Sequence, residues 1–446
     1  MKRLTRLRAC GLWSTALAAG AAVLFAHPAL AASPPPKLSP GDTAWMLTST
    51  ALVLMMTIPG LALFYAGMVR KKNVLATIMQ SFAITCLVTL TWWFAGYSLA
   101  FTDGVGAFKP YIGDLSRFLL NGMGATYDKA GFELAPTIPE SVYMMFQMTF
   151  AIITPALICG SFADRMKFSS MCVFMVAWSL LIYSPIAHWV WSATGWEGAL
   201  GVEDYAGGTV VHINAGIAGL MSALVLGKRV GYGSENMSPY NVAYAVIGAA
   251  LLWVGWFGFN AGSAVTSGPR AGMAMTVTQI ATAAAAMGWM FAEWITKGKP
   301  SVLGIASGAV AGLVAITPAS GFVLPTPSVI IGLVAGVLCY FSSTSMKHAF
   351  GYDDSLDTFG VHCIGGIIGA LLTGVFAYKG FVSAPQLPGG MAQFGHQVIG
   401  VLTALIYSGL GSLIILKVID ATMGLRVNSE EEREGLDIAL HGEQLG

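Results

Sequence analysis

Two histidines lie inside apolar segments at matching positions. His212 and His362 each follow an aspartate by eight residues, Asp204 and Asp354, and each sits in the pattern V-H-x-x-[AG]-G-I-x-G. A lone histidine in such a segment is often satisfied by backbone carbonyls, but two at equivalent positions favour a shared role. A metal centre is disfavoured, because stable centres need three or four ligands and Asp204 lies roughly 12 Å along a helix from His212. We therefore interpret the histidines as the lining of a passage.

An apolar passage lined by imidazoles would select its cargo by proton chemistry. A bare monovalent cation faces a desolvation cost of several kcal/mol even after relaxation. An amine with a pKa of about 9 can lose its proton at pH 7 for only about 3 kcal/mol. Potassium and sodium have no proton to lose, so the passage would favour amines.

Aromatic residues supply a site that could recruit such a cation. Trp189, Trp191 and Trp196 cluster in one segment, and Phe146 and Phe150 lie four residues apart on one helix face. Aromatic faces attract a cation without a counter-charge that would trap it. The alternative is an interfacial aromatic belt, which suits the three tryptophans as a group. For one of them we favour the recruiting site.

The composition places these residues in a membrane. Of 446 residues, 55% are hydrophobic and 10% are charged, against roughly 25% charged in soluble domains. The 23 Lys and Arg against 22 Asp and Glu leave no basic surplus for nucleic acid. No nucleophile-base pair or metalloprotease motif suggests an enzyme. We predict an all-α integral membrane protein without metal or cofactor, whose 54 glycines allow close helix packing.

The N-terminal residues have the pattern of a secretory signal peptide. Basic residues precede an apolar stretch at 12–25, and A-L-A at 29–31 matches a signal-peptidase site. The alternative, an uncleaved first helix, is disfavoured because the stretch is shorter than the roughly 20 residues that a membrane span needs. The predicted parts are a cleaved signal peptide (1–32), a membrane domain (33–420) and a tail (421–446).

Eleven apolar stretches of the mature chain are long enough to be transmembrane helices. Alternate connections between these helices fall on opposite sides of the membrane. One side, with the tail, holds thirteen Lys and Arg, and the other holds six. Because cytoplasmic connections are the richer in Lys and Arg, we predict an external N-terminus and a cytoplasmic C-terminus. The expected limits are Thr43–Met68, Val74–Phe101, Ser141–Ala163, Phe168–Ala187, Gly207–Leu226, Val242–Ala261, Ala271–Ile295, Ser301–Pro318, Pro325–Tyr340, Phe359–Tyr378 and Val398–Ile419.

An internal repeat relates helices 1–5 to helices 6–10. The pattern G-x-x-x-F-x-A-G ends helix 1 at 60–67 and helix 6 at 255–262, and the two histidine motifs lie in helices 5 and 10. An odd number of helices per repeat forces the second copy to be inverted in the membrane. Inverted repeats place the working site near the midplane, where the copies meet. Helix 11 lies outside the duplication.

These segments resemble one family, the ammonium transporters (Amt/Mep/Rh), and within it the bacterial Amt proteins. The likeness runs from about Thr43 to the tail. It is carried by T-I-P-G-L-A-L-F-Y-A-G-M-V-R-K-K-N-V-L (57–75), Y-S-P-I-A-H-W-V-W (183–191), D-Y-A-G-G-T-V-V-H-I-N-A-G-I-A-G-L (204–220), G-W-F-G-F-N-A-G-S-A (255–264) and D-T-F-G-V-H-C-I-G-G-I-I-G (357–369).

The resemblance implies a role for each site residue. Trp191 would recruit ammonium through cation-π contact, with Phe146 as a second aromatic wall and Ser263 as the hydroxyl that accepts an N–H. The stretch 192–203 is slightly longer than in the family, so Trp189 is the alternative recruiter. Asp204 would either cap helix 5, which we favour, or lower the cost of a nearby cation. The remaining roles are a stacked gate, Phe150 and Phe259, and a hydrogen-bonded histidine pair in the lumen, His212 and His362.

The resemblance also implies partners and a location. The family forms trimers with one pore per subunit, and bacterial relatives lie in the inner membrane and use their tails to couple to a PII-type signalling protein. Residues 424–437 keep a family-like pattern; a solvated charged end is the alternative. The expected function is ammonium transport and nitrogen uptake, with deprotonation before ammonia passes the histidines. An ammonium sensor of low conductance and an Rh-like gas channel are the alternatives.

Overall fold

Helices form nearly all regular structure in the computed structural model, which describes residues 37–123 and 132–446. The predicted signal peptide lies outside these residues. Among them, strand pairing is limited to two isolated bridges, Phe132 with Ala135 and Met166 with Arg426. Residues Leu38–Gly446 pack as one unit. The prediction of an all-α architecture is confirmed.

The described residues contain eleven helical spans, the predicted number. Nine are long and apolar enough to cross a membrane, and two complete the set: α12, which is rich in alanine and threonine, and the 15-residue α13. In chain order the spans are Pro40–Met68 (α2, η1, α3), Lys71–Phe101 (η2, α4, η3, α5), Glu140–Phe162 (α6), Phe168–Leu200 (α7, η7, α8, α9), Gly208–Leu226 (η8, α10), Val242–Ala261 (α11, η9), Pro269–Lys297 (α12), Val302–Ile316 (α13), Pro325–Phe350 (α14, η10, α15), Phe359–Phe376 (η11, α16) and Met391–Met423 (α17).

The last span is longer than its apolar pattern suggested. We expected Val398–Ile419, but α17 begins at Met391 and ends at Met423. Gln393 and Gln397 in its first turns are fully buried and hydrogen-bonded to backbone carbonyls. Polar side chains that find such partners do not end a helix, so hydropathy underestimated its length.

The repeat is visible in local helix geometry. One π-helical turn forms part of each helix in three repeat pairs, and such turns are common at functional sites. Helices 5 and 10 carry theirs at the histidines. The turns are η1 (Met56–Leu61) and η9 (Phe257–Ala261), η7 (Ser179–Tyr183) and η10 (Ser342–Met346), and η8 (Gly208–Ile213) and η11 (Phe359–Cys363).

Glycines bring the first helices of the two repeats together. A Cβ atom at Gly67 would lie 2.9 Å from the Cα of Ala245, and one at Gly248 would lie 2.6 Å from the Cα of Phe64. Both distances are too short for real side chains, so these positions require glycine. Small residues of this kind let membrane helices approach closely.

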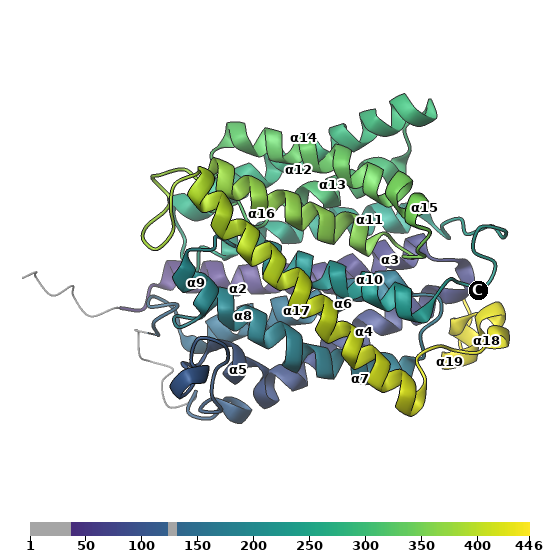
Figure 1. Cartoon of the computed structure of the whole chain (residues 1–446), viewed down its shortest axis with the longest axis horizontal. Helices are drawn as coiled ribbons and strands as arrows, with labels where there is room; N and C mark the ends of the chain where they lie inside the picture. Colours follow the sequence, from purple (N-terminus) through teal and green to yellow (C-terminus); the bar gives the residue numbers. More distant parts are fainter. Residues whose placement is uncertain (1–36, 124–131) are drawn as a thin grey trace, which may run out of the picture. The chain divides into compact units, whose positions relative to one another are not determined.

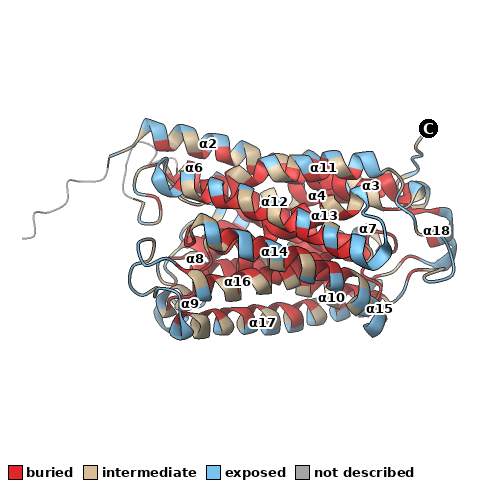
Figure 2. Ribbon diagram, turned by 90° about the horizontal axis from the view of Figure 1, so that it is seen from above, coloured by how far each residue is buried: buried red, intermediate tan, exposed pale blue. Residues whose placement is uncertain are grey.

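The spans place different chemistry at the two ends of the bundle. We call the end near Trp191 and Ser263 the aromatic end, and the end where residues 424–446 pack the tail end. Figure 1 shows α17 running obliquely across the other helices, from α9 at the aromatic end to the tail. Figure 2 shows buried residues inside the bundle and exposed residues on outward helix faces. Helix α10 (Asn214–Leu226) starts from the aromatic end and α16 (Ile364–Phe376) from the tail end, as inversion requires.

Candidate functional site

Two cavities lie at the aromatic end and share three lining residues. The smaller has a volume of about 130 Å³ and the larger about 310 Å³. Trp191, Tyr205 and Ser263 line both. The predicted recruiting residues Trp191 and Ser263 are therefore brought together, although they are 72 positions apart in the sequence.

Asp204 lines the larger cavity and builds the helix start next to it. Its carboxylate accepts hydrogen bonds from the backbone N–H groups of residues 207–210 and from the hydroxyl of Thr209, at 2.5 to 3.0 Å. Its backbone carbonyl accepts the indole N–H of Trp191 at 2.8 Å. Asp204 thus caps the helix that carries His212 and also orients Trp191.

The hydroxyl of Ser263 has its donor occupied. Its Oγ donates to the carbonyl of Phe259 at 2.8 Å, so the lone pairs of the oxygen are what it can offer to the cavity. A hydroxyl held in this way can accept an N–H from a bound cation.

The cavity wall on α6 differs from the one we expected. Phe146 is fully buried and lines neither cavity; its ring packs against Phe150 with 4.9 Å between centroids. Tyr143 and Gln147 line the smaller cavity together with Phe150. The spacing i, i+4, i+7 puts these three on one helix face, and Phe146 lies next to Phe150 at the edge of that face. Its role as a second aromatic wall stays a prediction.

A stack of rings lies below the cavities. Phe150 and Phe259, the predicted gate, are nearly parallel with centroids 4.1 Å apart and are at most 1% exposed. Phe150 also meets Trp191 edge-on at 5.8 Å. The two phenyl rings therefore lie between the cavity residues and the interior of the bundle.

The two histidines meet below this stack. The ring centroids of His212 and His362 are 5.4 Å apart with an interplanar angle of 19°, and that of Phe259 is 6.1 Å from His212. No hydrogen bond joins the imidazoles, contrary to our expectation, and both nitrogens of His212 and Nδ1 of His362 lack a partner among the described residues. The rings are close, but their nitrogens do not meet at hydrogen-bonding distance and direction. They remain available to another donor or acceptor.

Comparison with known proteins decides the family. The chain matches the profile of the Ammonium Transporter Family over residues 44–445. It is 50% identical to an ammonium transporter of Aquifex aeolicus, with 92% of this chain and 94% of the relative covered. An ammonium transporter of Bacillus subtilis is 46% identical, with 91% and 98% covered. The chain belongs to the ammonium transporter family.

Solved structures agree with this ammonium transporter fold. Saccharomyces cerevisiae Mep2 aligns with a TM-score of 0.80 at 34% identity, covering 88% of each chain. A protein named a sensor Amt protein aligns with a TM-score of 0.82 at 28% identity, covering 90% of this chain and 98% of that one. The resemblance stated from the sequence is confirmed, and the chain is a multi-pass membrane protein.

Within this ammonium transporter, Trp256 is a site neighbour that the sequence analysis missed. Its ring lies 5.4 Å from that of His212, at an angle of 19°, and its indole N–H donates to the hydroxyl of Thr317 at 2.9 Å. Trp256 stands inside the quoted helix-6 motif, so the repeat could have pointed to it. Its ring adds an apolar wall beside His212.

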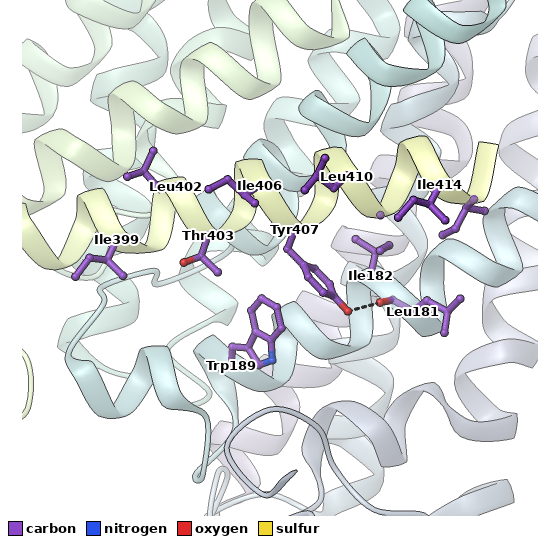
Figure 3. Close-up of a pocket in the computed structure, with 12 residues that line it drawn as sticks. Leu181, Ile182, Trp189, Ile399, Leu402, Thr403, Ile406, Tyr407, Leu410 and Ile414 are labelled. Atoms are coloured by element: carbon purple, nitrogen blue, oxygen red, sulfur yellow. Dashed lines mark hydrogen bonds between the residues drawn. The ribbon is translucent and has the colours of Figure 1, made fainter. Parts of the chain in front are cut away.

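Trp189, the alternative recruiter, lies outside both cavities. Its indole N–H donates to the carbonyl of Tyr111 at 2.6 Å, and its ring packs on Tyr407 with centroids 4.6 Å apart. Trp189 lines an apolar groove between α17 and the segment formed by η7 and α8 (Ser184–Trp191) (Figure 3). The groove has a volume of about 700 Å³. This location leaves Trp191 as the tryptophan of the cavities.

The tail end is held by ion pairs and hydrogen bonds. Asp353 pairs with Arg229 at 2.8 Å, and the tail residue Glu432 pairs with Arg426 at 2.7 Å. Glu432 also accepts the backbone N–H of Val230 at 2.7 Å. The tail contains the short helices α18 (Ser429–Glu434) and α19 (Leu436–His441). These contacts fix it against the bundle.

Proposed function

We propose that the chain recruits ammonium at the aromatic end, removes its proton at the Phe150–Phe259 stack, and conducts ammonia past His212 and His362. The observation that carries the proposal is the order of the parts: a cavity with Trp191, then two stacked phenyl rings, then two unpartnered imidazoles. The proton of ammonium passes to water of the cavity, and the N–H and lone pair of ammonia then replace the missing partners of the imidazoles.

The energetics favour this route over passage of the ion. Between the cavity and the imidazoles lie phenyl rings that are at most 1% exposed, where an ion would be costly. Loss of a proton costs ammonium about 3 kcal/mol at pH 7. Cation-π attraction to Trp191 and the lone pairs of Ser263 would hold ammonium at the entrance.

We further propose the cellular arrangement. The aromatic end faces outward and the basic tail end faces the cytoplasm of a bacterial inner membrane, after cleavage of the signal peptide. The subunit assembles as a homotrimer within the lipid. A PII-type signalling protein docks at the tail end, where residues 424–446 pack.

The test is ammonium transport by the purified chain in proteoliposomes. We expect ammonium uptake without potassium uptake, and a loss of at least about tenfold in flux, or entry of potassium, in His212→Ala. His348→Ala, which changes an exposed histidine outside the lumen, is the matched control. Unchanged ammonium flux and unchanged potassium exclusion in His212→Ala would contradict the proposal. Current that accompanies uptake would show electrogenic transport, and its absence would show electroneutral transport.

A sensor of low conductance is the second candidate, because the chain aligns with the sensor Amt protein over 98% of that protein. The proteoliposome assay separates the two. A sensor would bind ammonium at the aromatic end with little uptake, whereas a transporter would turn over many ammonium molecules per subunit. Uptake of dissolved gases at rates like those of ammonia would instead indicate an Rh-like channel.

A further inference from the structure

Arg270 is the basic side chain of the larger cavity. It lies at the start of α12 and lines the cavity with Trp191 and Ser263. Its guanidinium carbon lies 5.2 Å from the ring centroids of both Tyr205 and Phe322. None of the ion pairs formed by the described residues includes Arg270. The entrance thus contains a fixed cation that already occupies two aromatic faces.

Neither acidic neighbour of Arg270 forms an ion pair with it. The carboxylate of Asp204 is committed to the five donors of the helix start. Glu203 is fully buried and both of its carboxylate oxygens lack a partner. Burial raises the pKa of Glu203 to about 8, against the attraction of Arg270, so most of its population is protonated at pH 7.

We propose that Arg270 weakens the binding of ammonium at the aromatic end by like-charge repulsion, so that the entrance has low affinity and releases its cargo readily. The inference rests on the proposed function, because it requires ammonium to bind as a cation near Trp191. A cavity of about 310 Å³ is comparable in width with the screening length of roughly 8 Å in physiological salt. Ammonium and the guanidinium of Arg270 would therefore repel each other within this cavity, where the effective dielectric constant is lower than in bulk water.

The test is the concentration dependence of ammonium transport in proteoliposomes. We expect Arg270→Gln and Arg270→Met to lower the KM for ammonium by about threefold to about tenfold with little change in maximum rate. Arg270→Lys keeps the charge and should leave KM within about twofold of the wild-type value. The difference between Arg270→Gln and wild type should shrink as salt rises at constant osmolality. Lys299→Gln removes an exposed charge after the other end of α12 and serves as the control.

The outcomes separate repulsion from a packing role. If Arg270 mainly holds Tyr205 and Phe322 in place, Arg270→Gln and Arg270→Met would raise KM, which would overturn the proposal. An unchanged KM in both variants would overturn it as well. If the wild-type chain moves no ammonium while folding correctly, the proposed function fails before Arg270 is tested. Normal wild-type transport with the wrong order of KM values refutes the Arg270 inference alone.

Discussion

The two histidine-bearing helix starts occupy equivalent places in the repeats, yet they use their acidic residues in opposite ways. Each histidine follows a doublet of acids, Glu203-Asp204 in the first repeat and Asp353-Asp354 in the second. At the aromatic end Asp204 accepts five hydrogen bonds, while Glu203 has no partner for either oxygen. In the first doublet, the second acid, Asp204, therefore makes all the side-chain hydrogen bonds.

At the tail end the roles are exchanged. Asp353 pairs with Arg229 through both oxygens, and this guanidinium holds the pKa of Asp353 below its usual range although burial opposes it. Asp354 accepts one backbone hydrogen bond, from Phe359 at 2.7 Å, and its Oδ1 lacks a partner. Burial, and then the charge of Asp357, raise the pKa of Asp354.

The third residue after each capping aspartate accounts for part of this difference. Gly207 and Asp357 both have positive φ, 119° and 59°, a region that glycine and aspartate tolerate best. Gly207 adds no charge, and its N–H donates to Asp204. Asp357 brings a second carboxylate, which pairs with Lys347 at 2.6 Å and repels Asp354. The same backbone turn thus gives a saturated cap at one end and a weak cap at the other.

The largest effect should come from Asp204→Ala. The substitution leaves five donors without their acceptor, and each buried unsatisfied group costs at least about 1 kcal/mol, so we expect a loss of at least about 5 kcal/mol. Thermal unfolding of the purified chain in detergent measures it. The matched variant Asp354→Ala removes one hydrogen bond and should cost only about 1 kcal/mol. Equal losses in the two variants would show that the caps are equivalent after all.

The sequence predicted the spans and the repeat because hydrophobicity and motif spacing are sufficient for them. It did not predict the cavity face of α6, because that helix is buried on almost every side and no amphipathic pattern distinguishes Tyr143 from Phe146. The sequence also did not predict the different hydrogen bonding of the two acidic doublets. Both histidines follow an aspartate by eight residues, and only the folded structure shows which acid of each doublet has partners.

A smaller effect is expected from Asp353→Asn. The substitution leaves Arg229 buried with Asp164 as its remaining carboxylate, at 3.2 Å. Breaking a buried pair costs about 3 to 5 kcal/mol, and the remaining partner puts this variant near about 3 kcal/mol. The same unfolding assay should show that the loss diminishes little in high salt, since the pair is shielded from solvent. A cost below about 1 kcal/mol would mean that the pair does not support the tail end.

The smallest effect, and one of opposite sign, is expected from Glu203→Gln. A pKa raised from 4.5 to about 8 means that the folded chain holds this proton more tightly than the unfolded chain, so stability is full below about pH 4.5 and is lost as the pH rises toward 8. Glutamine keeps the shape of the protonated acid and cannot ionise. We therefore expect Glu203→Gln to match wild type at pH 4 and to exceed it by roughly 2 kcal/mol at pH 6, measured by thermal unfolding at each pH with the exposed Glu443→Gln as control. A variant that is less stable than wild type at pH 6 would show that Glu203 has a partner in solution, and the contrast between the two doublets would then disappear at the aromatic end.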